Sequence, residues 1–172
     1  MLAPRDVWSG TERLEPGALP RVSEGECPAC TWWNRGDAIY RDAEFVVHLA
    51  TFAARPGHLW VAPRNHVTRH TELSRTAWLA LQGVAHDALT ALEAYARPAR
   101  VYVAALGSVA PLERTFPHVH LHVVPIYDGG EGDRPSEVFT WKHGVVGYDE
   151  PAATRWREGL QAAWPASTCA PA

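Results

Sequence analysis

Residues 118–124 read His118-Val119-His120-Leu121-His122-Val123-Val124. In an extended strand alternate side chains point to the same face, so the three imidazoles are predicted to lie in a row about 7 Å apart, with the aliphatic residues between them facing inward. Histidine changes its charge close to neutral pH and is a common metal ligand, which favours a chemical role for this strand. A solvated strand face and an accidental metal site are the simpler alternatives.

The rest of the chain predicts strands around one long helix. Apolar residues recur at helical spacing after Ser74, which has the position of an N-cap, and a turn at Pro56-Gly57 separates two apolar runs. This pattern indicates the α+β class with an antiparallel sheet. The predicted elements are strands within residues 39–49, 58–62, 101–105 and 118–124, a helix from Ser74 to near Arg97, and a second helix over about residues 149–164.

The length and composition predict a single domain. With 172 residues, of which 47% are hydrophobic, the chain is long enough to bury one proper core. The first residues contain several prolines and glycines and show no periodic pattern, which is typical of a loosely held arm. We therefore expect an N-terminal arm over residues 1–24, one domain over residues 25–165, and a flexible tail over residues 166–172.

The charge and hydropathy of the chain exclude some partners. A formal net charge of −3 gives no electrostatic case for binding duplex nucleic acid, although a local basic pocket for a phosphate remains compatible with it. No apolar run has the length of a membrane span or of a signal peptide, so we expect a cytoplasmic protein with no membrane partner.

The cysteines indicate a metal or redox function. The chain has three cysteines, which are too few for a disulfide framework. Two of them form the motif Cys27-Pro28-Ala29-Cys30, and in a reducing compartment such a pair is either metal-binding or redox-active.

Three ordered blocks carry a family resemblance. Residues 118–124 resemble the signature of the histidine-triad, or HIT, superfamily of nucleotidyl hydrolases and transferases. The stretch from Pro56-Gly57-His58 to His66 resembles the segment that precedes the long helix in that family, and Cys27-x-x-Cys30 precedes both blocks. The resemblance spans about residues 27 to 125. It implies a HIT-like antiparallel half-barrel sheet backed by helices, a homodimer, and a nucleotide lying across the triad strand.

The resemblance also implies roles for individual residues. His120 would be the nucleophile that attacks the α-phosphorus of a nucleotide, and His122 would bind a phosphoryl oxygen. Thr115 lies where relatives carry a hydroxyl residue that contacts the phosphate or the leaving group. His58 matches a relay histidine in part of the family, with a satisfied strand histidine as the equal alternative. Arg114 either binds phosphate or is a surface charge.

His118 has two readings within the family. In relatives that lack a metal, the corresponding residue joins the hydrogen bonds behind the nucleophile. In the branch that has Cys-x-x-Cys, it resembles a zinc ligand together with a histidine after the second block. Because this chain has Cys27, Cys30 and His66 as well as His118, the resemblance implies a closed structural Zn²⁺ site with four protein ligands.

Together these features predict a nucleotidyl hydrolase that acts on a dinucleoside polyphosphate, a nucleoside phosphoramidate or a related nucleotide conjugate. A nucleotidyltransferase resembling hexose-phosphate uridylyltransferase is the runner-up, although those enzymes carry Gln where this chain has His122. A zinc-stabilised nucleotide-binding module without catalysis is a further alternative, because Ala50 stands where relatives hold the ribose with an acidic residue. Trp141 is interpreted as a core aromatic residue, and a position closing over the leaving group is the less favoured alternative.

Overall fold

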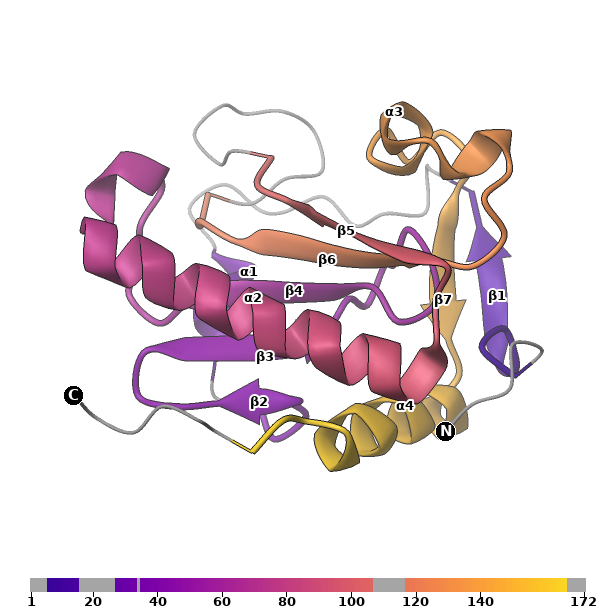
Figure 1. Cartoon of the computed structure of the whole chain (residues 1–172), viewed down its shortest axis with the longest axis horizontal. Coiled ribbons are helices and arrows are strands. Elements are labelled where there is room, and N and C mark those ends of the chain that lie inside the picture. Colours follow the sequence, from indigo (N-terminus) through magenta and orange to yellow (C-terminus); the bar gives the residue numbers. More distant parts are fainter. Residues whose placement is uncertain (1–5, 16–26, 34, 107–116, 167–172) are drawn as a thin grey trace.

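The computed structural model describes residues 6–15, 27–33, 35–106 and 117–166 (Figure 1). Its larger sheet has five strands in the order β2-β3-β4-β6-β5, and each neighbouring pair is antiparallel. The strands are β2 (Tyr40–Arg41), β3 (Phe45–Leu49), β4 (Leu59–Pro63), β6 (Leu121–Ile126) and β5 (Arg100–Ala104). This arrangement confirms the predicted antiparallel sheet and the predicted hairpin around Pro56-Gly57.

One face of the sheet packs against the long helix α2 (Arg75–Ala96), which crosses in front of the strands in Figure 1. Ser74 is its N-cap as predicted, because the Ser74 Oγ accepts a hydrogen bond from the Ala77 N–H at 3.1 Å. The helix ends at Arg97, which has a φ of 50° and is followed by Pro98. The buried residues between helix and sheet include Val47, Leu59, Val61, Leu81, Leu92, Leu121 and Val123.

The opposite face of the sheet carries a second, smaller core. Trp60 and Ala62 of β4 and Val46 of β3 pack there with Ala29 of α1 (Pro28–Trp32). Registers across the strands place His48 opposite Trp60, and Trp60 opposite His122. Cross-strand partners share a face, so this second face is the one on which His122 lies.

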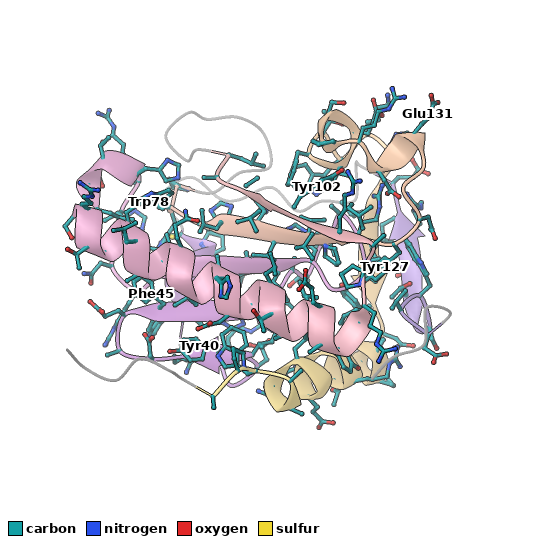
Figure 2. The ribbon with its side chains drawn as sticks, in the orientation of Figure 1. Tyr40, Phe45, Trp78, Tyr102, Tyr127 and Glu131 are labelled. Carbon is teal, nitrogen blue, oxygen red and sulfur yellow. The ribbon has the colours of Figure 1, made fainter. Side chains whose placement is uncertain are left out.

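A second long helix packs against α2, β3 and β7 (Val145–Tyr148). The helix α4 (Glu150–Ala162) begins at Asp149, whose Oδ1 accepts a hydrogen bond from the Ala152 N–H at 2.7 Å. Trp156 and Leu160 are the fully buried residues that tie α4 to the main core. Figure 2 shows the side chains in the same orientation, with Phe45 labelled below α2 and Tyr127 above its C-terminal end.

Residues 11–14 differ from the expectation of a loosely held N-terminal arm. Thr11–Leu14 form β1, which pairs antiparallel with β7 (Val145–Tyr148) in a separate two-stranded sheet. Val7, just before β1, is fully buried. The strand partner lies at the far end of the sequence, and such a non-local pairing leaves no periodic signal in a segment of four residues.

The triad segment also differs from its predicted form. β6 begins at Leu121, three residues after the predicted start at His118. The Val119 N–H donates to the Val67 carbonyl at 2.8 Å, and the His118 carbonyl is bonded by the His120 side chain at 2.7 Å. The ladder pairs of β6 with β4 and β5 begin at Leu121 and His122, so residues 118–120 lie outside the ladder, and the three imidazoles do not form an even row.

Shorter elements lie in the connections between the longer ones. They are the 3₁₀ helices η2 (His70–Glu72) and η3 (Glu131–Asp133) and the helix α3 (Pro135–Val138). In Figure 1 α3 lies above β5, close to the end of β7. Among the described residues, none of the helices has the length and apolar character needed to cross a membrane.

Candidate functional site

Three histidines form a continuous chain of ring contacts. His58 Nε2 lies 3.0 Å from His122 Nδ1, and His122 Nε2 lies 3.1 Å from His120 Nε2. His58 directly precedes β4, whereas His122 lies in β6, and these two strands are neighbours in the sheet. The structure therefore brings together the sequence-predicted residues His58, His120 and His122.

Backbone groups at both ends determine the proton positions in this chain. The Ala54 N–H donates to His58 Nδ1 at 3.1 Å, so a neutral His58 carries its proton on Nε2. His58 Nε2–H then donates to His122 Nδ1, and His122 donates from Nε2 to His120 Nε2. At the other end, the His118 carbonyl can only accept, so His120 donates from Nδ1. Every ring has one assignment, and His120 presents the Nε2 lone pair.

Burial keeps these rings neutral. Burial lowers the pKa of His58 to about 3, with the charge of His120 as a smaller cause. Burial also lowers the pKa of His122 well below its usual value, and it lowers the pKa of His120 despite the hydrogen bond to the His118 carbonyl. A neutral imidazole is the form that can act as a nucleophile, so burial favours the form of these rings that is capable of that chemistry near neutral pH.

His118, the first triad histidine, belongs to a second cluster beside His120 and His122. Its Nδ1 lies 3.3 Å from Cys27 Sγ and 3.6 Å from Cys30 Sγ, and His66 Nδ1 lies 3.3 Å from Cys30 Sγ. One potential ligand atom from each of these four residues lies within 4.8 Å of the others. The structure therefore assembles the four sequence-predicted metal ligands from α1, the segment after β4 and the triad segment.

The donor set fits a tetrahedral ion. Around zinc, with Zn–S of about 2.3 Å and Zn–N of about 2.0–2.1 Å, ligand atoms lie roughly 3.3–3.8 Å apart. The Nε2–H of His118 donates to the Pro63 carbonyl at 2.8 Å, which leaves Nδ1 as a lone-pair donor facing both sulfurs. Burial, followed by the Cys27 hydrogen bond and charge, raises the pKa of Cys30 to about 11, and a bound cation would favour the Cys30 thiolate over the thiol.

Two aromatic rings from the segment after α3 face the triad. The Trp141 ring lies 5.8 Å from the His122 ring between centroids, and the Phe139 ring lies 6.2 Å from it. Trp141 has a φ of 54°, a left-handed conformation that is unfavourable for a large side chain. Sequence reasoning favoured a core role for Trp141, whereas the structure places its half-buried ring against the site.

A pocket on the far side of Trp60 was not indicated by the sequence. Its lining includes His48, Ala50, Thr51, Asp37, Tyr148 and Arg157. His48 is buried and stacked on Trp60, with its Nδ1 at 3.3 Å from Asp37 Oδ1. Burial lowers the pKa of His48 to about 4, although the nearby Asp37 charge opposes this shift.

Two predicted residues cannot be placed. Arg114 and Thr115, which the resemblance assigned to phosphate or leaving-group contacts, lie outside the described residues. By contrast, sequence reasoning missed the Ala54 N–H that fixes the His58 ring, because a backbone donor has no residue signature. It also missed Arg55, which is almost buried in the same loop.

Comparisons with known proteins identify the fold and match most of the site region. The HIT domain model matches residues 34–129, which include His58, His66 and the three triad histidines. A comparison with curated protein sequences gave no match.

Solved structures of histidine-triad proteins superpose on the chain. A hypothetical histidine triad nucleotide-binding protein from Sulfolobus tokodaii has a TM-score of 0.65 and 17% identity, over 80% of this chain and 91% of that one. A Zn-bound histidine triad family protein from Mycobacterium smegmatis has a TM-score of 0.60 and 21% identity, over 80% and 94% of the two chains. A histidine triad protein from Bradyrhizobium japonicum has a TM-score of 0.59 and 19% identity, over 75% and 92%.

Proposed function

We propose that this chain, which belongs to the HIT domain family, is a nucleotidyl hydrolase. The proposed reaction passes through an intermediate in which the nucleotide is bound to a histidine. Membership of the family supports a nucleotide-binding role within a superfamily of hydrolases and transferases. The finer proposal is that the substrate is a dinucleoside polyphosphate, a nucleoside phosphoramidate or a related nucleotide conjugate. The observation that carries the proposed attack by His120 is the one-directional chain of hydrogen bonds, which leaves the lone pair of His120 on Nε2.

The proposed reaction has two displacements at one phosphorus. His120 Nε2 attacks the α-phosphorus, a P–N bond forms, and the bond to the leaving group breaks with its electron pair. Water then attacks the same phosphorus, gives a proton to solvent, and releases the nucleoside monophosphate with the imidazole restored. Dividing the displacement in this way lowers the barrier of each step.

The hydrogen bonds of the site support this chemistry. Once His120 carries the nucleotide on Nε2 and a proton on Nδ1, its ring is cationic, and the His118 carbonyl at 2.7 Å stabilises that charge. His122 Nε2–H then turns from His120 toward a phosphoryl oxygen, where negative charge accumulates in the transition state. His58 acts as a relay residue that holds the His122 tautomer. Thr115 and Arg114 are proposed contacts for the leaving group and the phosphates.

A structural zinc ion is part of the proposal. Cys27, Cys30, His66 and His118 would hold it, and four protein ligands leave no position for a reacting water. Such an ion stabilises the fold and fixes the segment from which His120 projects.

A homodimer is also proposed. β5 is an edge strand of the described sheet, and Val103 and Leu106 beside this edge are each 41% exposed. Exposed apolar side chains along an unpaired strand edge favour pairing with a second copy. Light scattering on the purified protein measures the mass in solution, with two chains expected.

A panel of adenylyl and guanylyl substrates tests the activity. Wild-type protein and a His120→Gln variant are incubated with dinucleoside polyphosphates and phosphoramidates, and the products are separated by chromatography. The proposal expects release of a nucleoside monophosphate by the wild type and none by His120→Gln. Absence of turnover for the whole panel would favour a binding role, and transfer to an added sugar phosphate would favour the transferase.

A further inference from the structure

Arg55 makes a dense set of hydrogen bonds at the start of the histidine chain. It lies in the loop between β3 and β4 and is 8% exposed. Its Nη1 donates to the Ala54 carbonyl at 2.7 Å, its Nε donates to Asp133 Oδ1 at 2.8 Å, and its Nη2 donates to the Gly132 carbonyl. All three guanidinium nitrogens are therefore used, and two of them reach across to η3.

Asp133 fixes η3 to other parts of the chain. Its Oδ2 accepts a hydrogen bond from the Gly129 N–H at 2.9 Å, and its carbonyl accepts from the Tyr102 hydroxyl at 2.9 Å. Figure 2 shows Tyr102 on the side of β5 that faces the segment containing Glu131. The carboxylate thus joins the β3–β4 loop to the segment that continues into α3.

The Arg55–Asp133 ion pair connects two parts of the candidate site. On one side is Ala54, whose N–H donates to His58 Nδ1 and fixes the proton of His58 on Nε2, where the histidine chain begins. On the other side is the segment that continues to Trp141, whose ring lies 5.8 Å from the His122 ring. This largely buried ion pair therefore links the loop of the donor that begins the chain to the segment whose Trp141 ring contacts His122.

A buried ion pair is a poor source of net stability, because the loss of hydration offsets much of the attraction. The planar guanidinium of Arg55 is nevertheless well suited to fixing geometry, since it holds several donors in one rigid plane. We propose that Arg55 and Asp133 are positioning residues for the reaction. They hold the Ala54 amide on His58 and the Trp141 ring against His122. This inference rests on the proposed function, but part of it can be tested without a substrate.

The test compares two ways of altering the pair. Arg55→Lys keeps the charge and loses the planar fork, whereas Arg55→Met combined with Asp133→Leu replaces the pair with apolar side chains and leaves no buried charge unpaired. Arg134→Gln is the matched control, because Arg134 lies next to Asp133 and pairs with Glu131 at the surface. For each protein the melting temperature, kcat and KM are measured, together with the ring nitrogen signals of His58 and His122 by NMR.

The proposal expects kcat of both altered proteins to fall on the order of tenfold to a hundredfold, as small misplacements of reacting groups do. The double variant should keep a melting temperature near that of the wild type and remain slow. Its His58 ring should lose the single-tautomer signals of the wild type, while Arg134→Gln matches the wild type in every measurement.

Recovery of kcat together with stability in the double variant would overturn the inference, since a merely structural pair predicts that result. Unchanged His58 signals in both altered proteins would overturn it as well. The NMR measurement needs no nucleotide. If the wild type shows no turnover, the proposed function is contradicted, but the His58 signals still test whether Arg55 and Asp133 position His58. An altered His58 signal in such a protein supports the inference.

Discussion

His58 Nε2 donates to His122 Nδ1 across 3.0 Å, and this contact joins the residue before β4 to the third triad histidine, in β6. The contact sets the position of the His122 proton, which in turn faces the lone pair of His120 at 3.1 Å. His58 touches no reacting atom, yet it fixes which nitrogen of His122 accepts and which donates.

Replacing His58 with Leu should slow the reaction. Without the donor, His122 loses its fixed tautomer, and outer hydrogen-bond partners of this kind change activity by roughly tenfold to a hundredfold. Steady-state kinetics on the best substrate of the panel measure kcat, and His86→Leu on the exposed side of α2 is the control. Equal kcat for His58→Leu and wild type would show that His58 is only a satisfied strand histidine.

The stability of the protein should fall in mild acid. Because the folded pKa of His58 is about 3 and the unfolded value is near 6.5, the unfolded chain binds the extra proton between these values. The contribution of neutral His58 to stability is therefore complete above about pH 6.5 and is lost as the pH falls toward 3. Between pH 7 and pH 5, protonation of His58 in the unfolded chain lowers the free energy of unfolding by about 2 kcal/mol.

Urea unfolding at pH 7 and pH 5 measures this loss for the wild type and for His58→Leu. The Leu variant lacks the titrating ring, so its stability should depend less on pH over this range. The same pH dependence in both proteins would contradict the assignment of the loss to His58.

Loss of the metal should destabilise the fold before it changes the chemistry. Purified protein that has never met a chelator should hold close to one zinc per chain, and Cys30→Ser should hold little. Because metal binding contributes directly to folding, the variant should melt on the order of 10 °C lower. Elemental analysis and thermal melts measure both quantities. Wild type that is purified without zinc and that melts at the same temperature as Cys30→Ser would contradict the metal site.

Trp141 provides a test of the left-handed backbone at 54°. Trp141→Gly and Trp141→Ala both remove the ring that faces His122, so both should raise KM or lower kcat. Only glycine adopts this conformation without strain, so the Gly variant should be more stable than the Ala variant by about 1 kcal/mol. Chemical unfolding of the two variants gives the difference, and a more stable Ala variant would contradict the left-handed conformation.

The helices and the sheet were accessible to sequence reasoning because their signals are local. Ser74 and the apolar spacing that follows it predict α2, and the turn at Pro56-Gly57 predicts the hairpin. The pairing of β1 with β7 depends on two segments far apart in the chain, and a four-residue strand carries no pattern of its own.

The candidate site divides in the same way. His58, His120, His122 and the four metal ligands have side chains with recognisable chemistry and spacing, and the structure brings each group together. β6 begins only at Leu121, and the His120 side chain bonds the His118 carbonyl before it, a contact that strand periodicity cannot reveal. The contact of Trp141 with His122 depends on how the segment after β6 folds back, so a pattern of aromatic residues alone predicted the core instead.

The central claim is that His120 carries the nucleotide during turnover. Wild-type protein is mixed with a substrate that turns over, quenched within the first cycles, digested under conditions that preserve P–N bonds, and analysed by tandem mass spectrometry. The account predicts the mass of one nucleoside monophosphate on the peptide containing residues 118–124, located at His120, and no such adduct in His120→Gln. Turnover by the wild type with the adduct on another residue, or undiminished turnover by His120→Gln, would contradict it.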